Sequence, residues 1–535
     1  MDEYLLIAEK PSLMRAIKEA YEKHKKEFAY KIDFIAVAGH TMRLLLPSEI
    51  NAKYKKWIIN NYPLEIEYKY TIIKGKEAIY KEIKERIRSG RYKKIIHAGD
   101  ADGEGELLVR LVLDDIKNPL PVLRFWNNNL NEENIIEDLK NMKEDKEYDG
   151  YMDAALLRQQ MDYAFGMNLT GLITLKMGTL IKLGRVKGAM IRLIADREKE
   201  IENFVPRRDY IHTVETKGYV LNGKNIYPTE KEARETLCDE GEITSVEEKD
   251  VEKRAPELFK LSTAQAAAAS LYGYNGSETL SIIQSLYEKK LVTYPRTDCE
   301  YLPTNTDVVT IINKIGDFIN LSGNPLQNPK DVKKDKHYFN DVEVAKEGHT
   351  ALIPTGSYMA ELSTAEKNIY IMIIRRFVAI FGLPKKIHKI HIKGKANEEE
   401  YECKVEDEEY AGYELILNPE YELKHCNREE IKVGKIEDGK WGIKEVKAKC
   451  PSRYSIASFI KALDRKDKES GIIYRIGTPA TRANIIEECI KCGYFTLEGK
   501  NYKALPLSKQ LVQELGEIDI FNIETTARWA TKQLQ

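Results

Sequence analysis

Short apolar runs alternate with amphipathic stretches at the start of the chain. Runs of this kind, each followed by a turn and a helical periodicity, are typical of strands that alternate with helices in a parallel sheet. Residues 1–150 are therefore expected to form one α/β domain, which closes with a solvated run at 131–150. The predicted strands are 4–8, 34–37 and 94–98, and the predicted helices are 13–24 and the segment that begins near residue 104.

The pattern changes several more times along the remainder of the chain. Long amphipathic helices follow residue 150, and helical periodicity returns twice later, while two turn-rich stretches between them alternate as strands do. This order suggests that the chain leaves a β domain, builds a helical domain and comes back, so that two domains are discontinuous. The predicted domains are 1–150, 151–205 with 450–535, 206–260 with 387–449, and 261–386.

Length and composition agree with this division. The chain has 535 residues, of which 42% are hydrophobic, and this predicts a globular protein of three or four domains. The composition excludes collagenous, mucin-like and wholly disordered chains. Because 84 Lys and Arg face 85 Asp and Glu, the net charge is -1. A histone-like basic coat is thereby excluded, but a local basic surface is not.

The sequence shows no sign of a membrane span or a secretory signal. No run of about eighteen uncharged apolar residues occurs, and residues 1–3 include two acids where a signal peptide would be basic. The seven cysteines are odd in number and scattered, which fits a reducing compartment. We therefore expect a soluble cytoplasmic protein.

An acidic cluster stands where a buried strand meets a helix. Asp100, Asp102 and Glu104 follow the predicted strand 94–98, and Glu9 lies at the corresponding end of the first strand. In an open α/β sheet, ligands bind at the carboxyl ends of the strands. Four carboxylates that converge there repel one another, and a hard divalent cation such as Mg²⁺ would offset that repulsion.

Two other interpretations of the acidic cluster compete with a metal site. An EF-hand loop fails because its twelfth position would be Leu111 rather than a bidentate Glu. A solvated acidic turn that caps a helix is the second alternative, and for the D-x-D-x-E pattern alone it is the commoner outcome. The preceding strand and Glu9 favour the metal.

One of the 31 tyrosines stands apart by its context. Pro295 holds Tyr294 in an extended conformation, in which residues two apart point the same way, so Tyr294, Arg296 and Asp298 are expected on one side. A phenol beside a guanidinium suits attack on a phosphodiester, because Arg can bind the phosphate and neutralise its charge. An ordinary turn with an exposed Tyr-Pro pair explains the spacing equally well.

Taken together, these motifs resemble those of the type IA DNA topoisomerases, most closely the topoisomerase III branch. The resemblance covers nearly the whole chain and keeps the order of the family. Two motifs look like the halves of a metal-binding Toprim domain, and the others look like the nucleophile, histidine and DNA-contacting motifs. They lie at 6–12, 100–106, 293–298, 349–355, 184–186 and 477–483.

The resemblance implies a multidomain α/β and α+β fold, in which a Toprim α/β domain joins helical and β domains in a toroidal clamp. It implies that one DNA strand is cleaved through a transient 5′-phosphotyrosine, another strand passes, and the first is religated. Negative supercoils would be relaxed, or DNA decatenated, without ATP. The absence of a G-x-x-x-x-G-K-[ST] motif agrees with this.

The resemblance also implies roles for individual residues. The tyrosine would attack the phosphate, the arginine and lysine would position and stabilise it, and a glutamate would protonate the leaving 3′ oxygen. The histidine would hydrogen-bond the phosphate or an adjacent group. The implied catalytic residues are Tyr294, Arg296, Glu9, Lys10 and His349, and the implied Mg²⁺ ligands are Glu9, Asp100, Asp102 and Glu104.

A DNA groove is also expected. Residues 176–194 contain five bases and no acid, which predicts a local basic stripe. Thr478 and Pro479 are typical of a helix N-terminus, which can receive a phosphate. With the matched family positions, the expected DNA contacts are His40, Arg124, Arg158, Asp162, Lys182, Gly184, Arg185, Lys187, Asp298, Thr481 and Arg482.

The chain departs from the family pattern at three positions: Gly103 replaces an Arg, Lys187 a Gln and Ile456 a Glu. Cys489 and Cys492 form a single C-x-x-C pair, so packing rather than zinc is expected. The expected partner is single-stranded DNA within supercoiled or catenated duplex, for a monomer associated with the nucleoid and a helicase as a candidate partner. The alternatives are another Toprim enzyme, such as a primase or nuclease, and a non-catalytic single-strand clamp.

Overall fold

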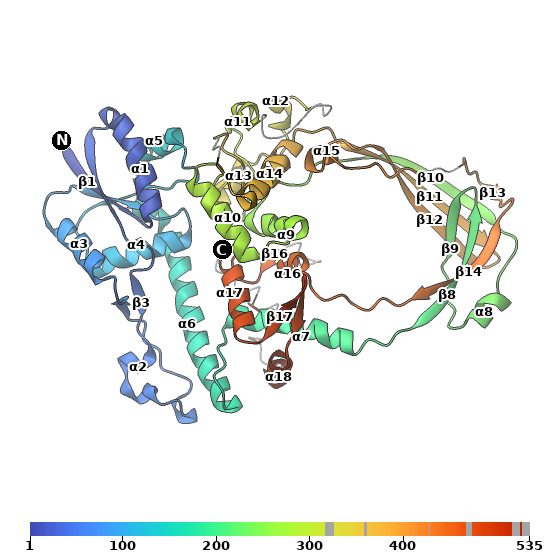
Figure 1. Ribbon diagram of the computed structural model, residues 1–535, viewed down its shortest axis with the longest axis horizontal. Coiled ribbons are helices and arrows are strands. Elements are labelled where there is room, and N and C mark those ends of the chain that lie inside the picture. The colour runs from blue at the N-terminus through green and yellow to red at the C-terminus, as the bar shows by residue number, and fades with distance from the viewer. Residues whose placement is uncertain (316–325, 358–360, 427–428, 467–472, 516–524, 527–535) are drawn as a thin grey trace.

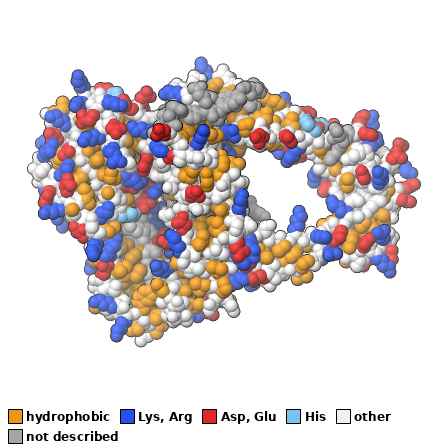
Figure 2. All heavy atoms as spheres, in the orientation of Figure 1, with side chains coloured by type: hydrophobic (Ala, Val, Ile, Leu, Met, Phe, Trp, Pro, Cys, Tyr) orange, Lys and Arg blue, Asp and Glu red, His pale blue; other side chains and the backbone are white. Residues whose placement is uncertain are grey.

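The computed structural model describes residues 1–315, 326–357, 361–426, 429–466, 473–515 and 525–526. Its elements form a ring around a central opening, with the N-terminal domain and the helical parts on one side and a long sheet on the other (Figure 1). The space-filling view shows the same opening passing through the molecule (Figure 2). Within the described residues, no helix has the length and apolarity that crossing a bilayer would require.

The N-terminal domain contains a five-stranded sheet of order β2-β1-β5-β6-β7. The first four strands in this order are parallel, and β7 is antiparallel to β6. The centre of β1 is apolar on both faces and fully buried, which is typical of a strand covered by helices on both sides. The strands are β1 (Asp2–Ala8), β2 (Tyr30–Ala36), β5 (Lys94–Ala98), β6 (Val122–Arg124) and β7 (Lys143–Glu144).

The helices of this domain correct one prediction. The run 131–150 was expected to be solvated, but it contains the helix α5 (Glu132–Lys140), whose Ile135, Ile136 and Leu139 are buried. Three apolar residues among charged ones are enough for one face of a short helix to pack, here against α1. The helices and 3₁₀ turns are α1 (Pro11–His24), α3 (Glu77–Arg88), α4 (Gly103–Ile116), η1 (Lys25–Glu27) and η4 (Asp145–Tyr148).

A small lobe projects from the same domain. It lies between the two short strands β3 and β4, which pair with each other, and it extends beside the helix α6 (Figure 1). Its elements are β3 (Met42–Leu44), α2 (Pro47–Ile50), η2 (Ala52–Lys55), η3 (Ile59–Asn61) and β4 (Tyr70–Ile72), and α6 spans Asp149–Met177.

The C-terminal part of the chain packs on the helix α7 and encloses a core of its own. There, α7 contacts α17, α18 and β18. A wholly helical C-terminal segment was predicted, but the structure contains two antiparallel strand pairs, β15 with β16 and β17 with β18, because strands this short give little periodicity. The elements are α7 (Arg185–Glu202), α16 (Ile456–Ala462), β15 (Asp464–Lys466), β16 (Ile473–Arg475), α17 (Pro479–Lys491), β17 (Phe495–Glu498), β18 (Asn501–Ala504) and α18 (Pro506–Leu515).

The far side of the ring is a seven-stranded sheet of order β13-β10-β11-β12-β9-β8-β14. Its strands come from two separate stretches of the chain, and the longest of them pair antiparallel. The elements are β8 (Arg208–Thr216), β9 (Tyr219–Gly223), α8 (Glu230–Glu235), β10 (Glu242–Lys253), β11 (Lys385–Ala396), β12 (Glu399–Tyr410), β13 (Gly434–Lys435) and β14 (Lys440–Lys447).

Between these two stretches the chain builds a helical domain. One continuous hydrophobic cluster joins Phe125 and Leu130 of the N-terminal domain to Tyr294, Leu352 and Phe377 of this domain. The two domains therefore pack against each other without an intervening gap. The division of the chain into four domains stays a prediction. The elements are α9 (Leu261–Tyr272), α10 (Gly276–Glu288), α11 (Val308–Ile315), α12 (Pro329–Val332), α13 (Asp341–Glu347), α14 (Thr364–Ala379) and α15 (Glu414–Leu417).

Candidate active site

The carboxylates of Glu9 and Asp100 lie at the same edge of the N-terminal sheet. Glu9 follows β1 and Asp100 lies just beyond β5, and these strands are parallel neighbours in which Ala8 pairs with Ala98. Both side chains are buried, and the Asp100 N–H donates to Glu9 Oε2 at 3.0 Å. The strand-end argument from the sequence therefore places these two acids as expected.

Gly105 allows the helix α4 to begin very close to this edge. A Cβ atom there would lie 2.5 Å from the backbone N and O of Asp100 and 2.9 Å from Glu9 Oε2. At the start of the helix, Asp102 is the N-cap and accepts a hydrogen bond from the Gly105 N–H at 2.7 Å. The capping interpretation of the cluster is thus correct for Asp102.

Tyr294 meets the acidic cluster from the helical domain. Its hydroxyl donates to Asp102 Oδ2 at 2.8 Å, and its N–H donates to the Asn128 carbonyl at 3.0 Å. The ring is only 1% exposed and stacks on His349, with centroids 5.0 Å apart. Burial, reinforced by the charge of Asp102, raises the pKa of Tyr294 well above its ordinary value. The tyrosine is therefore a protonated phenol at neutral pH.

Lys10 partly compensates the two buried acids beside it. Its Nζ lies 2.5 Å from Asp100 Oδ2 and 3.4 Å from Glu9 Oε1. Burial, and next the charge of Asp100, still raise the pKa of Glu9 to about 7. A carboxyl group with such a pKa can both hold and release a proton near neutral pH.

Arg296 lies beside the two acids of the cluster at the start of α4. Its Nη1 is 3.6 Å from Glu104 Oε2 and 3.9 Å from Asp102 Oδ2. Although burial raises the pKa of Asp102, the Arg296 charge, the Gly105 N–H and the Tyr294 hydroxyl outweigh it and hold that pKa below its usual range. The Nε of Arg296 is buried without a hydrogen-bond partner among the described residues. This N–H group therefore remains available to donate a hydrogen bond to an anion.

Two histidines border the site. His40 Nε2 lies 3.2 Å from Glu104 Oε1, and this contact raises the pKa of the imidazole and lowers that of the carboxyl. His349 Nδ1 lies 2.6 Å from Asn128 Oδ1, and burial lowers the pKa of His349 to about 4. His349 is therefore neutral at physiological pH.

The donor set of the cluster fits a hard divalent cation. Glu9, Asp100, Asp102 and Glu104 offer carboxylate oxygens, the ligand type that Mg²⁺ prefers. Their mutual repulsion is visible in the raised pKa of Glu9 and of Asp100, which is caused by burial first and by neighbouring carboxylates next. Among the described residues, two groups other than this cluster bring three possible metal-ligand atoms within 4.8 Å of one another. They are His97 with Glu106 and Asp145, and Asp250 with His388 and Glu409.

Three arginines that were expected to contact DNA are buried in internal networks. Arg124, which is 1% exposed, donates to Glu106 at 2.7 Å and to the Asp100 carbonyl at 2.7 Å. Arg185 donates to Asp162 at 3.0 Å. Arg482, also 1% exposed, donates to Asp464 at 2.6 Å, while its Nη1 has no hydrogen-bond partner among the described residues. In this conformation Arg124 and Arg185 hold the protein together, so a contact with DNA would need a rearrangement.

The predicted basic stripe is largely neutralised, because two acids from other segments and one from the same helix lie against it. Lys176 pairs with Glu514, Lys187 with Glu488 and Arg192 with Asp196. The C-terminal acids were invisible to a reading of 176–194 alone. Of the remaining expected contacts, Lys182 is exposed, Arg158, Gly184 and Thr481 are half-buried, and Asp298 lies 3.3 Å from Arg475.

Sequence reasoning missed three residues that shape the site. Asn128 holds both Tyr294 and His349, Glu106 anchors Arg124, and Arg475 faces Asp298. The signals that were available are the polar run 127–129 after β6 and the second Glu of the acidic motif. Cys489, by contrast, is fully buried in the C-terminal core, as the packing interpretation requires.

Comparison with known proteins defines the class of the chain. Residues 146–534 match a family described as DNA topoisomerase, and residues 4–130 match the Toprim domain. The chain belongs to this DNA topoisomerase family, and its N-terminal domain is a Toprim domain, a known divalent-metal-binding domain.

The curated relatives and a solved structure narrow the class. The chain is 29% identical to DNA topoisomerase 3 of Staphylococcus aureus and 31% identical to DNA topoisomerase 3 of Staphylococcus epidermidis, in each case over 99% of this chain and 78% of the relative. Full-length topoisomerase I from Thermotoga maritima shares the fold, with a TM-score of 0.71, 21% identity, and 99% and 86% of the two chains covered. The protein is thus a type IA topoisomerase similar to topoisomerase III, which cleaves and religates single DNA strands without ATP.

Proposed function

We propose that Tyr294 is the nucleophile and that Glu9, Lys10, Arg296 and His349 assist it. The observation that carries this proposal is the hydrogen bond from the Tyr294 hydroxyl to Asp102, which joins the tyrosine to the acidic edge of the Toprim sheet. Arg296, two residues further along, supports the same link through its ion pairs with Glu104 and Asp102. The substrate is a single-stranded segment within negatively supercoiled or catenated DNA.

The protonation states of Tyr294 and Glu9 suit a reversible transfer of the phosphoryl group. Tyr294 Oη attacks phosphorus, the bond from phosphorus to the 3′ oxygen breaks, and the phenol proton is released to water once DNA has displaced the hydrogen bond to Asp102. Glu9, whose pKa is about 7, gives a proton to the leaving 3′ oxygen. In religation the Glu9 carboxylate takes that proton back from the 3′ hydroxyl and the Tyr294 oxygen regains a proton from water, as microscopic reversibility requires.

The cations and the histidine have separate tasks. Lys10, beside Asp100, and Arg296, beside Glu104, neutralise charge on the phosphate, with the unpartnered Arg296 Nε as one donor. Neutral His349 stacks on the nucleophile and fixes its ring. The half-buried or exposed residues His40, Arg158, Lys182, Gly184, Thr481 and Asp298 would line the strand, together with the free Nη1 of Arg482.

Asp100, Asp102, Glu104 and, once it has given up its proton, Glu9 would hold Mg²⁺, which supplies positive charge that offsets the phosphate and the carboxylates. Chelation with EDTA is expected to stop relaxation of a negatively supercoiled plasmid. Mg²⁺ is also expected to raise the melting temperature of the wild type more than that of Asp100→Asn, because it relieves repulsion among the acids. Relaxation that continues in EDTA would contradict the metal assignment.

The covalent adduct gives the sharpest test of the tyrosine. A 3′-labelled oligonucleotide should remain attached to the denatured protein, whereas a 5′-labelled one should be released, because the link is a 5′-phosphotyrosine. Tyr294→Phe should form no adduct. Tyr287→Phe is the matched control, since Tyr287 is a buried ring packed edge-on against Tyr294 at 5.6 Å. An adduct on Tyr294→Phe would overturn the proposal.

The cellular task of the protein is relaxation of supercoils, decatenation, or both. Both relaxation and decatenation follow from strand passage through the ring, and a comparison of the two rates on supercoiled and catenated plasmids would rank them. We propose that the protein acts as a monomer near the nucleoid, with a helicase as the partner that supplies single strands. Sedimentation of the free protein at micromolar concentration tests the first part.

A further inference from the structure

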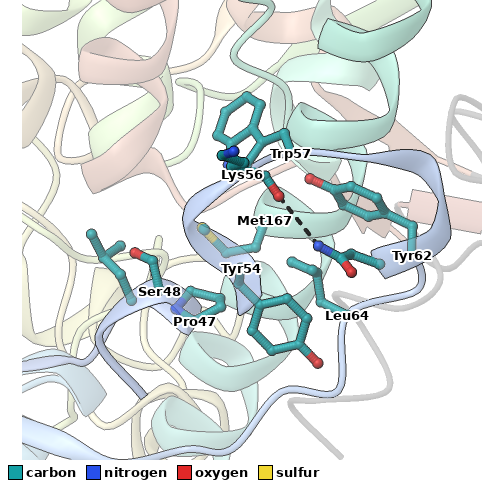
Figure 3. A pocket seen from close by; sticks show the side chains of 10 residues that line it. Pro47, Ser48, Tyr54, Lys56, Trp57, Tyr62, Leu64 and Met167 are labelled. Carbon is teal, nitrogen blue, oxygen red and sulfur yellow. Dashed lines mark hydrogen bonds between the residues drawn. The ribbon is translucent and has the colours of Figure 1, made fainter. Parts of the chain in front are cut away.

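The lobe between β3 and β4, residues 45–69, forms a cavity against the helix α6. The cavity has a volume of about 190 Å³ and holds Met167 of α6 in its wall. Figure 3 shows the lining side chains arranged around Met167, with Trp57 on one side and Tyr54 and Leu64 on the other. The lining residues are Leu46, Pro47, Ser48, Tyr54, Lys56, Trp57, Asn61, Tyr62, Leu64 and Met167.

The lobe is fixed to α6 rather than loosely attached. The Tyr62 hydroxyl occupies the space left by the missing side chain of Gly171, where a Cβ would lie 1.7 Å from it. The Leu64 N–H donates to Asn168 Oδ1 at 2.7 Å, and the Tyr163 hydroxyl donates to the Leu45 carbonyl at 2.7 Å. The cavity is therefore preformed, which lowers the entropic cost of filling it.

The exposed surface of the lobe combines lysines with an aromatic ring. Trp57 is 39% exposed, and Lys55 and Lys56 beside it are exposed and make no ion pair among the described residues. No acid occurs between Glu49 and Glu65. Lysines are depleted from protein–protein interfaces, whereas aromatic rings beside lysines are typical of surfaces that bind single-stranded nucleic acid. This charge complementarity favours a nucleic acid as the occupant.

The helix α6 connects this lobe to the acidic site. It lies against the acidic motif at Tyr151 and Ala155, which a Cβ on Gly103 would meet at 3.3 and 3.5 Å, and Met167 lies twelve positions beyond Ala155, about 18 Å at 1.5 Å per residue. Arg158 and Asp162, two of the expected DNA contacts, lie on the same helix between these points. A strand that follows α6 away from the site would reach the lobe.

We propose that the lobe is a binding subsite for single-stranded DNA, in which a base stacks on Trp57 at the mouth of the cavity and Lys55 and Lys56 hold the adjacent phosphates. The proposal rests on the proposed path of the strand along α6. At the 3.4 Å spacing of one strand of B-DNA, the distance of about 18 Å corresponds to roughly five nucleotides, and to fewer in a stretched strand. The lobe would thus bind the strand well away from the scissile phosphate.

The test measures affinity as a function of strand length. In a Tyr294→Phe background, which prevents cleavage, Trp57→Ala should weaken binding of a labelled 25-nucleotide strand by about 5- to 150-fold, the range for loss of one stacked base. A three-nucleotide strand, which is too short to span this distance, should bind equally well with or without Trp57. Trp57→Phe should retain most of the affinity, and Trp441→Ala, in the distant sheet, is the matched control.

Each outcome decides the matter. Unchanged affinity for the long strand would overturn the subsite and leave the lobe as a surface for a protein partner. Equal weakening on both strands, or no rescue by Trp57→Phe, would also overturn it, because the effect would then come from altered structure. The proposed function is tested separately: with Tyr294 intact, Trp57→Ala should still form the covalent adduct, and absence of the adduct in the wild type would refute the function alone.

Discussion

The hydroxyl of Tyr294 donates to Oδ2 of Asp102 at 2.8 Å, although 192 positions separate the two residues in the chain. The tyrosine belongs to the helical domain and the aspartate caps the first helix turn beside the Toprim sheet. Because the ring is 1% exposed, a DNA strand can reach the phenol only when this contact loosens. The hydrogen bond thus closes the two domains over the site and must yield to the substrate.

Glu9→Gln is expected to slow adduct formation by about 10²–10⁴-fold, the usual contribution of a positioned acid. The amide keeps the size of the side chain and can still accept from the Asp100 N–H, but it cannot protonate the leaving 3′ oxygen. Rapid-quench measurement of the adduct on a labelled strand gives the rate. Glu3→Gln, at the far end of the same strand, is the control. A Glu9→Gln rate within twofold of wild type would show that another group supplies the proton.

Gly105→Ala should lose both activity and stability. Its Cβ would collide with the Asp100 backbone and with Glu9 Oε2, and relief of such overpacking costs about 1–3 kcal/mol. Gly150→Ala is the matched control, since a Cβ at that helical position meets no atom within 4 Å. Urea unfolding and the adduct assay check both effects. If Gly105→Ala behaves like Gly150→Ala, the tight approach of α4 to Glu9 is not required.

Buried His349 should make stability depend on pH. Burial lowers its folded pKa to about 4, whereas in the unfolded chain it titrates near 6.5. Between these values the unfolded state binds more protons, so the free energy of unfolding should fall as pH decreases from 6.5 to 4, by up to about 3 kcal/mol from this group. Urea titrations across that range should show a shallower loss for His349→Gln than for wild type. The same change at exposed His425 should leave the slope alone.

Gly103→Arg should strengthen DNA binding. Gly103 departs from the motif expected for the family, which has an Arg at this position. A Cβ there would meet only the Tyr151 carbonyl at 3.3 Å and Ala155 Cβ at 3.5 Å. An added guanidinium at the start of α4 would bring one more cation to the phosphates. The plot of log affinity against log salt for single-stranded DNA should steepen by about 0.7. An unchanged slope would show that this position lies away from the strand.

The strand-end rule was sufficient to bring Glu9 to Asp100, because parallel neighbours in a sheet end at one edge. No local pattern could bring Tyr294 to Asp102, since that contact depends on how two domains pack. The family resemblance bridged this gap by motif, while Asn128, which positions both Tyr294 and His349, escaped notice.

The distribution of charge on the predicted DNA-binding surface was the property that the sequence predicted least well. The bases of 176–194 appeared as an open stripe, but Glu488 and Glu514 arrive from the end of the chain and neutralise two of them. Arg124 was expected to contact DNA, but its guanidinium group donates hydrogen bonds inside the domain to Glu106 and to backbone carbonyls. The number of basic residues in one segment predicts a positively charged surface only where no distant segment packs against them.

The seven-stranded sheet takes its strands from two separate stretches, so the chain passes between the sheet and the helical parts six times. On one side it runs from α7 into β8 and from β14 toward α16, and on the other from β10 to α9, from α14 into β11, from β12 to α15 and from α15 to β13. Two attachments at one end and four at the other resist twisting far better than a single swivel would. An opening of the ring is therefore expected to bend these attachments rather than twist its halves against each other. When Tyr294 holds one end of a broken strand, the other end is expected to move away and return in register instead of rotating freely.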